Sequence, residues 1–142
     1  MIDYSNKQDK QFDIIHETSV DFVLRPCARE VNIVQNDDDL SLLKVHLYRD
    51  SEPFKLDVSD LDSLTFDLLY ARPNMTHPEP VEALYYSKDE NNKVSVIYFP
   101  ITNNMSLLNG FCKAVVRMTH TNQGAQKVAQ SSPLLFKVLR QY

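Results

Sequence analysis

The fold of this chain is set by residues 40–56, which read Leu-Ser-Leu-Leu-Lys-Val-His-Leu-Tyr-Arg-Asp-Ser-Glu-Pro-Phe-Lys-Leu. Three apolar side chains, Leu43, Val45 and Leu47, alternate here with more polar ones. A period of two is typical of a β-strand that has one face in a core and the other toward water or a partner. The polar run at residues 49–53 then predicts a turn, after which a short second strand begins.

The same succession of strand, polar turn and strand continues along the chain. Alternation predicts further strands at residues 22–24, 31–34, 64–71, 81–86, 94–99, 111–118, 128–132 and 133–139. Residues 81–99 are expected to form one hairpin with a polar tip. A helical stretch is expected at residues 101–109, with Gly110 as its terminator, and one short helical turn at residues 57–62, with Asp57 or Ser59 as its cap. Because no strand–helix–strand alternation occurs, the sequence predicts an all-β fold, an antiparallel β-sandwich of about seven to nine strands.

Length and composition limit the kind of protein further. The chain of 142 residues fits one domain, placed at residues 22–142, and a hydrophobic content of 43% argues against wholesale disorder. The net charge is -4 and no basic block occurs. Because nucleic acids and anionic membranes are bound by clustered Lys and Arg, neither is an expected partner. No apolar run reaches the roughly 18 residues of a membrane span, and the polar N-terminus is unlike a signal peptide, so we expect synthesis in the cytoplasm.

Residues 1–21 are expected to form an extended arm outside this domain. The first ten residues are polar, with Tyr4 as their one aromatic residue, and Phe12, Ile14 and Ile15 form a short apolar cluster without a sustained period. One interpretation is a frayed terminus. The other is an arm that becomes ordered on a neighbouring subunit, because the apolar cluster would otherwise leave its surface in water.

The last predicted strand supplies further candidates for contact with a neighbour. It carries apolar residues on both faces, so that Leu135 and Leu139 point outward when their neighbours in the sequence enter the core. A two-sided strand suggests that part of its outer face meets another chain. Phe22, at the junction of arm and domain, is a further interface candidate, as are Tyr4, Phe12, Ile14 and Ile15 of the arm.

Residue types that serve catalysis or metal binding occur here without a recognisable spacing. Cys27 and Cys112 lie far apart, and the four histidines are scattered, whereas a structural zinc site needs about four ligands. No nucleophile elbow occurs, and the presence of only two glycines, Gly110 and Gly124, argues against a Gly-rich phosphate loop. The sequence therefore predicts that the protein is not an enzyme and uses no metal or cofactor.

A binding loop offers an alternative role. Residues 72–80 hold three prolines, which cannot donate to a strand ladder, so we expect an exposed loop. Exposed tyrosines stack well on sugars, although packing in the core or at sheet edges is their more common role. The candidate ligand residues of such a carbohydrate-binding module are Arg72, Asn74, His77, Tyr85 and Tyr86.

The order of these elements resembles one known family. The strand at residues 42–50 runs into a tight polar turn, and Leu-Thr-Phe-Asp-Leu-Leu follows at residues 64–69. Next come Asn-Lys-Val-Ser-Val-Ile-Tyr-Phe-Pro at residues 92–100, Gly-Phe-Cys-Lys-Ala-Val-Val at residues 110–116 and Ser-Ser-Pro-Leu-Leu-Phe-Lys-Val at residues 131–138. This succession resembles the N-terminal domain of the baseplate upper proteins of tailed bacteriophages, a module that is similar to the base of head fibres.

The resemblance implies an Ig-like β-sandwich that attaches receptor-binding or fibre parts to the virion, commonly as a trimer. It implies that the partners are further copies of this chain and other virion proteins of the capsid, neck or tail. The implied location is the virion, assembled in the cytoplasm of the host. The interface residues of the arm and of the last strand would then serve these contacts.

Two departures from the family pattern shape the functional expectation. The family usually has a glycine in the first turn, where this chain has Ser51-Glu52-Pro53. The family domain is usually followed by a fibre or coiled-coil segment, whereas this sequence ends at Tyr142. We therefore expect an adaptor or decoration subunit, such as a head-fibre base, a capsid auxiliary protein or a baseplate attachment. A carbohydrate-binding module for adsorption to the host surface is the alternative.

Overall fold

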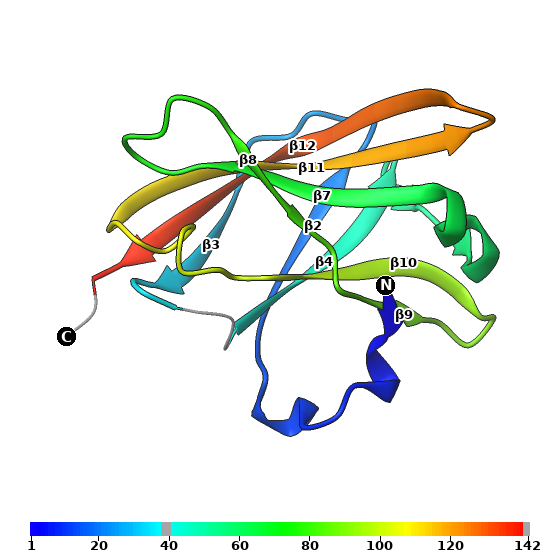
Figure 1. Cartoon of the computed structure of the whole chain (residues 1–142), viewed down its shortest axis with the longest axis horizontal. Coiled ribbons are helices and arrows are strands. Elements are labelled where there is room, and N and C mark those ends of the chain that lie inside the picture. Colours follow the sequence, from blue (N-terminus) through cyan, green and yellow to red (C-terminus); the bar gives the residue numbers. More distant parts are fainter. Residues whose placement is uncertain (38–40, 141–142) are drawn as a thin grey trace.

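The computed structural model describes residues 1–37 and 41–140 and forms a β-sandwich of two sheets (Figure 1). Leu40 and the last two residues of the predicted domain lie outside the described residues. No helix in the described part of the chain is long and apolar enough to cross a membrane. The strands are β1 (Ile2–Asp3), β2 (Ile14–Asp21), β3 (Arg29–Val34), β4 (Ser41–Arg49), β5 (Glu52–Pro53), β6 (Leu56–Asp57), β7 (Leu64–Ala71), β8 (Glu79–Glu82), β9 (Tyr85–Lys88), β10 (Lys93–Pro100), β11 (Gly110–Asn122) and β12 (Ala125–Leu139), and the short 3-10 helices are η1 (Tyr4–Asn6), η2 (Lys10–Phe12) and η3 (Val58–Ser63).

The two sheets confirm the predicted all-β sandwich. The larger sheet has the order β1-β9-β10-β4-β2, with β5 paired to β4 and β6 paired to β10. The smaller sheet has the order β3-β12-β11-β7-β8. Most neighbouring strands are antiparallel, as predicted, but β1 with β9, β2 with β4 and β3 with β12 run parallel. Each parallel pair attaches an edge strand to its sheet, so the departure from a purely antiparallel fold is confined to the edges.

The core lies between the sheets and is filled by residues at the predicted period of two. Leu43, Val45 and Leu47 of β4 are at most 1% exposed. They belong to one cluster with residues of the smaller sheet, among them Phe66 of β7 and Phe136 of β12. Burial of each such side chain contributes about 1.5–3 kcal/mol to folding. The stretch that sets the fold therefore also contributes several kcal/mol to its stability.

The N-terminal segment departs from the expected arm. Residues 14–21 form β2, which pairs along its whole length with β4. The sequence suggests an arm because Ile14 and Ile15 are adjacent and interrupt the alternation, yet Thr18 and Val20 follow at a period of two and are buried. Their burial makes β2 a strand of the sandwich. Within residues 1–13, β1 joins the edge of the larger sheet beside β9, and the residues that follow β1 form a short lobe outside the sandwich (Figure 1).

The predicted hairpin at residues 81–99 is divided between the two sheets. β8 lies in the smaller sheet, whereas β9 and β10 lie in the larger one. The chain crosses at two adjacent residues: the N–H of Ala83 donates to the carbonyl oxygen of Phe66 at 3.0 Å, and that of Leu84 donates to Tyr98 at 2.9 Å. The hairpin is therefore limited to β9 and β10, and the preceding strand belongs to the opposite layer.

The predicted helical turn at residues 101–109 forms turns and bends without a helix. Thr102 and the asparagines that follow compete with the backbone for hydrogen bonds, and a segment of this length nucleates a helix poorly. Met105 is nevertheless fully buried, as expected. The predicted turn at residues 57–62 is confirmed as a short 3-10 helix, η3, at Val58–Ser63, where the N–H of the cap residue Asp57 donates to the Asp60 carboxylate at 2.8 Å.

Candidate functional site: a capped corner, a pocket and two apolar surfaces

A buried carboxylate organises one corner of the sandwich. Asp21, the last residue of β2, accepts four backbone N–H groups: those of Val23 and Leu24 at 2.8 Å, Asp50 at 3.1 Å and Ser51 at 2.8 Å. Burial of this carboxyl group by itself raises its pKa, but the four donors together outweigh burial and lower the pKa to about 2. Asp21 is therefore ionised at neutral pH and fixes two loops to the end of β2.

The turn between β4 and β5 explains why these donors need an acceptor. Asp50 and Ser51 both have left-handed backbones, with φ of 54° and 68°. Two such residues between paired strands make a type I′ turn, for which Asn-Gly or Asp-Gly is usual. This chain builds the turn without glycine and instead binds both turn amides with the carboxylate of Asp21.

The same corner joins the two sheets through a β-bulge. The register of β11 and β12 shifts by one residue between Val115 and Arg117, which places two consecutive serines, Ser131 and Ser132, in the interior. The Ser131 hydroxyl accepts the N–H of Val116 at 2.9 Å, and the Ser132 hydroxyl accepts the N–H of Asp21 at 3.0 Å. A hydroxyl of the smaller sheet thus binds the end of an edge strand of the larger sheet.

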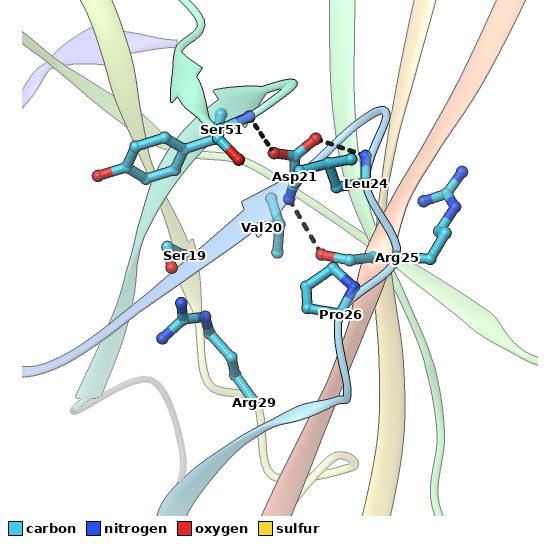
Figure 2. A pocket seen from close by; sticks show the side chains of 10 residues that line it. Ser19, Val20, Asp21, Leu24, Arg25, Pro26, Arg29 and Ser51 are labelled. Carbon is cyan, nitrogen blue, oxygen red and sulfur yellow. Dashed lines mark hydrogen bonds between the residues drawn. The ribbon is translucent and has the colours of Figure 1, made fainter.

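A cavity of about 560 Å³ opens beside this corner (Figure 2). Its wall combines hydroxyl groups, a few apolar side chains and two arginines. In the described part of the chain, Arg25 and Arg29 have no ion-pair or hydrogen-bond acceptor, and both are exposed. Free guanidinium groups beside hydroxyls are suited to bind carboxylates or other oxyanions. The lining residues are Ser19, Val20, Asp21, Leu24, Arg25, Pro26, Arg29, Tyr48, Ser51 and Ser132.

The outer face of the smaller sheet carries an apolar surface, here called the outer patch: Val34, Phe111, Leu135 and Leu139. Leu139 lies opposite Val34 in the parallel pair of β12 with β3. Val34, Phe111 and Leu139 are 50%, 49% and 42% exposed, and Leu135 is half-buried. The register brings Phe111 diagonally beside Leu139, because Phe111 pairs with Lys137. The two predicted interface residues of the last strand therefore lie in one exposed apolar surface.

The N-terminal interface candidates separate into two groups. Tyr4 packs inside the chain: its ring stacks on Tyr98 at 4.4 Å between centroids. Phe22 contacts Phe54 edge-to-face and packs against the core. The remaining three candidates, Phe12, Ile14 and Ile15, are 69%, 49% and 36% exposed. Phe12 ends η2, just before β2, and Ile14 and Ile15 begin β2, where their side chains point to opposite faces of the strand.

The structure does not bring the candidate carbohydrate-binding residues together. The loop between β7 and β8, with Arg72, Asn74 and His77, lies at the upper left of Figure 1, whereas β9 lies at the lower right. The two tyrosines of β9 also point apart: Tyr85 contacts the ring of Tyr4 and Tyr86 packs against the core.

The two cysteines differ in accessibility. Cys27 is exposed in the loop between β2 and β3, and Cys112 is buried, which raises its pKa to about 11. Among the described residues, no group of three or more His, Cys, Asp or Glu is arranged to hold a metal ion.

Sequence reasoning missed the corner and the pocket. The carboxylate of Asp21 meets donors both next to it and about thirty residues away, so no local motif marks it. Arg25 and Arg29 flank Pro26 and Cys27 in a loop without periodicity. Their one signal is the pair of arginines beside a proline, which by itself specifies no ligand. The strand predicted just before this proline, at residues 22–24, is wrong, because β2 ends at Asp21 and a loop follows.

The chain was compared with known proteins. No known family model matches it, and no curated protein is similar to it. Among solved structures, it is similar to the N-terminal domain of ORF48 of phage TP901-1, with a TM-score of 0.61 and 10% sequence identity. The match covers 88% of this chain and 98% of that domain. At this identity the similarity shows a shared fold.

Proposed function

We propose that this protein is a structural component of a phage particle, a non-catalytic adaptor that docks on neighbouring virion proteins. The observation that carries the proposal is the shared fold with the N-terminal domain of a phage protein, which this chain matches over almost the whole of that domain. The order of sequence elements that resembles phage baseplate upper proteins supports the same assignment.

The outer patch supports a docking role. A contiguous apolar surface that is exposed on a folded domain is typical of a contact with another protein. Two lysines, Lys113 and Lys137, lie on the same face among these apolar residues, so a partner surface with apolar and acidic residues would complement it. We propose that this face makes the subunit contact of a homotrimer.

The virion assignment is tested by mass spectrometry of particles purified from a lysate in which the gene for this chain is expressed during phage growth. We expect the chain to co-purify with the particles at a copy number comparable with those of other structural proteins. A chain that is abundant in the lysate but absent from the particles would overturn the proposal.

The trimer is tested by light scattering on the purified chain. We expect a trimer for the unmodified protein and a monomer for Phe111→Asp and Leu139→Asp, since each places a charge in the outer patch. Val128→Asp is the matched control, because Val128 is an exposed valine on β12 outside the outer patch. If the unmodified chain is a monomer, or if Val128→Asp dissociates it equally, the outer patch is not the subunit contact.

A further inference from the structure

The direction of the backbone groups along β2 is fixed by two hydrogen bonds at its end. The N–H of Phe22 donates to the carbonyl oxygen of Tyr48, at the end of β4, at 3.0 Å. The N–H of the preceding residue, Asp21, points to the other side and donates to Ser132. Successive residues of a strand direct their backbone groups to opposite sides. Even-numbered residues of β2 therefore bond to β4, and odd-numbered residues face away from it.

Three residues of β2 consequently present their backbone to a free edge. Ile15, Glu17 and Ser19 direct their N–H and C=O groups away from β4, and β2 is the last strand on this side of the larger sheet. Among the residues that the structure describes, no strand pairs with this edge. A row of free donors and acceptors at strand spacing is a template for an added strand.

This edge has fewer of the features that usually protect an edge strand from pairing than the other sheet edges have, although β2 carries the exposed Glu17. β1 is only two residues long, β8 contains Pro80, and β3 carries Glu30 and Asn32 on its exposed positions. β2 has eight residues, without proline or lysine, and it begins with the exposed Ile14 and Ile15. Ile14 and Ile15 place one exposed apolar side chain on each face of β2, against which side chains of an added strand would pack.

The free edge leads directly into the pocket. Ser19 and Asp21 at the end of β2 belong to its wall, and Arg29 stands opposite at the start of β3. Figure 2 shows Arg29 extended toward Ser19, with Arg25 on the far side of Pro26. Both guanidinium groups lack an acceptor in the described residues, whereas the carboxylate of Asp21 is already satisfied by four amides. Two unpaired cationic side chains, Arg25 and Arg29, therefore lie at the end of the free edge of β2.

We propose that β2 and this pocket together bind an extended acidic segment of a partner protein. The segment adds to the larger sheet as an antiparallel strand on Ile15, Glu17 and Ser19, and its N-terminal acidic side chains bind Arg25 and Arg29. This gives the docking role proposed above a specific site, and it rests on that role for the class of partner. An acidic segment is favoured because the unpaired charges of the site are both cationic.

A second copy of this chain fits the edge less well. Antiparallel pairing of β2 with itself around a two-fold axis at Glu17 places the two glutamates directly opposite each other. Like charges at opposed positions destabilise a strand pair. Glu17 already binds Lys44 at 3.1 Å on its own chain, so no cation is left there to separate the two carboxylates.

The test uses two synthetic peptides and the full chain. The acidic peptide is acetyl-Asp-Asp-Thr-Val-Thr-Val-Thr-Val-amide, and its neutral counterpart has two asparagines in place of the aspartates. Amide hydrogen exchange is followed by NMR. We expect the acidic peptide to slow exchange at Ile15, Glu17 and Ser19, and the neutral peptide to bind about tenfold or more weakly, since bonds to charged groups are the stronger ones.

Two variants separate the contributions of edge and pocket. R25Q with R29Q should remove the preference for the acidic peptide, whereas the control K55Q with K127Q, which removes two exposed charges outside the pocket and the outer patch, should keep it. Ser19→Pro removes an N–H from the free edge without removing a bond to β4, and should weaken binding of both peptides. Its NMR spectrum reports whether it is folded, and the arginine variants test the proposal on their own.

Several results would overturn this inference. They are equal binding of the two peptides, binding of neither, an effect of acetate or sulfate alone that equals that of the acidic peptide, and protection of the three amides by concentration-dependent self-association without any peptide. The last result would assign the edge to a second copy. None of them affects the particle test of the virion assignment, so the failure of one proposal is distinguishable from the failure of the other.

Discussion

The carboxylate of Asp21 accepts the backbone N–H of Ser51 at 2.8 Å, across 30 residues of sequence. Ser51 has a φ of 68°, in the region where glycine is favoured. The chain thus holds a tight turn with a buried carboxylate from another strand. The corner depends on a single ionised group, so the stability of the fold should respond to substitution and to protonation of Asp21.

Replacing Asp21 with Ala should lower the free energy of unfolding by about 2–4 kcal/mol, because four backbone donors lose their acceptor and some stay buried without a partner. Asp21→Asn should cost less, since one acceptor oxygen is kept. Urea denaturation measures both values. Asp62→Asn, at an exposed aspartate, is the control and should change stability by under about 0.5 kcal/mol. An equally small effect at Asp21 would contradict this account of the corner.

The contribution of Asp21 should also vary with pH in a defined direction. Its pKa is lowered from 3.8 to about 2 in the folded state, so the ionised form stabilises the fold. This contribution is complete above about pH 4 and is lost as the pH falls through about 2. The unmodified protein should therefore lose stability more steeply than Asp21→Asn over this window. Parallel denaturation series that keep a constant difference between the two proteins would count against the prediction.

A branched side chain at Ser51 should not be tolerated. A left-handed backbone costs about 1–2 kcal/mol for a residue with a Cβ, and more for valine or isoleucine. Serine already carries this cost, so Ser51→Val should add only the extra clash of its branched Cβ and lower the unfolding free energy by about 1 kcal/mol. Ser51→Asn should be nearly neutral, because asparagine adopts this conformation readily. Thermal denaturation of the two variants, side by side, provides the comparison. Equal melting temperatures would show that the turn relaxes to another type.

The sandwich could be predicted from sequence wherever one face of a strand is buried and the other is not. Leu43, Val45 and Leu47 in β4, and Cys112, Ala114 and Val116 in β11, show this pattern and are buried as expected. Strand pairing beyond neighbours could not be predicted, because it depends on contacts between distant segments. The parallel docking of β2 on β4 and the crossing at Ala83 are examples.

The candidate site was less predictable than the fold. Leu135 and Leu139 could be identified as interface candidates, because a strand with two apolar faces needs a second partner. Tyr4 and Phe22 could not be distinguished from exposed aromatics, since their contacts lie with Tyr98 and Phe54, many residues away. The same reason hides Asp21, whose role exists only when two loops and a bulge converge on it.

The two cysteines should differ strongly in reactivity. Cys27 is exposed, whereas Cys112 is fully buried and burial raises its pKa to about 11, so little thiolate is available there. A maleimide reagent at neutral pH should modify one thiol rapidly and the second only on unfolding, and peptide mapping should place the first label on Cys27. Rapid modification of both thiols in the folded protein would contradict the burial of Cys112.

Release of the N-terminal lobe should follow from the loss of the Tyr4 ring. This ring stacks on Tyr98, and its hydroxyl donates to the Asp13 carboxylate at 2.9 Å. Tyr4→Ala should therefore speed hydrogen exchange at Ile2, whose N–H bonds to Leu84, without unfolding the sandwich. Tyr4→Phe keeps the stacked ring and should have a smaller effect.

The packing of Tyr4 against the sandwich should weaken at alkaline pH, when its hydroxyl group loses its proton. Burial and the hydrogen bond to Asp13 raise the pKa of Tyr4 to about 12 from 10.0, so the neutral form stabilises the lobe. Its contribution is complete below about pH 10 and is lost as the pH rises through about 12. The exchange rate at Ile2, divided by that of an unprotected amide at the same pH, should then rise over this window in the unmodified protein but less in Tyr4→Phe, because phenylalanine has no proton to lose. If both proteins respond alike, the lobe is held by β1 and β9 alone, and the tyrosine stack does not anchor it.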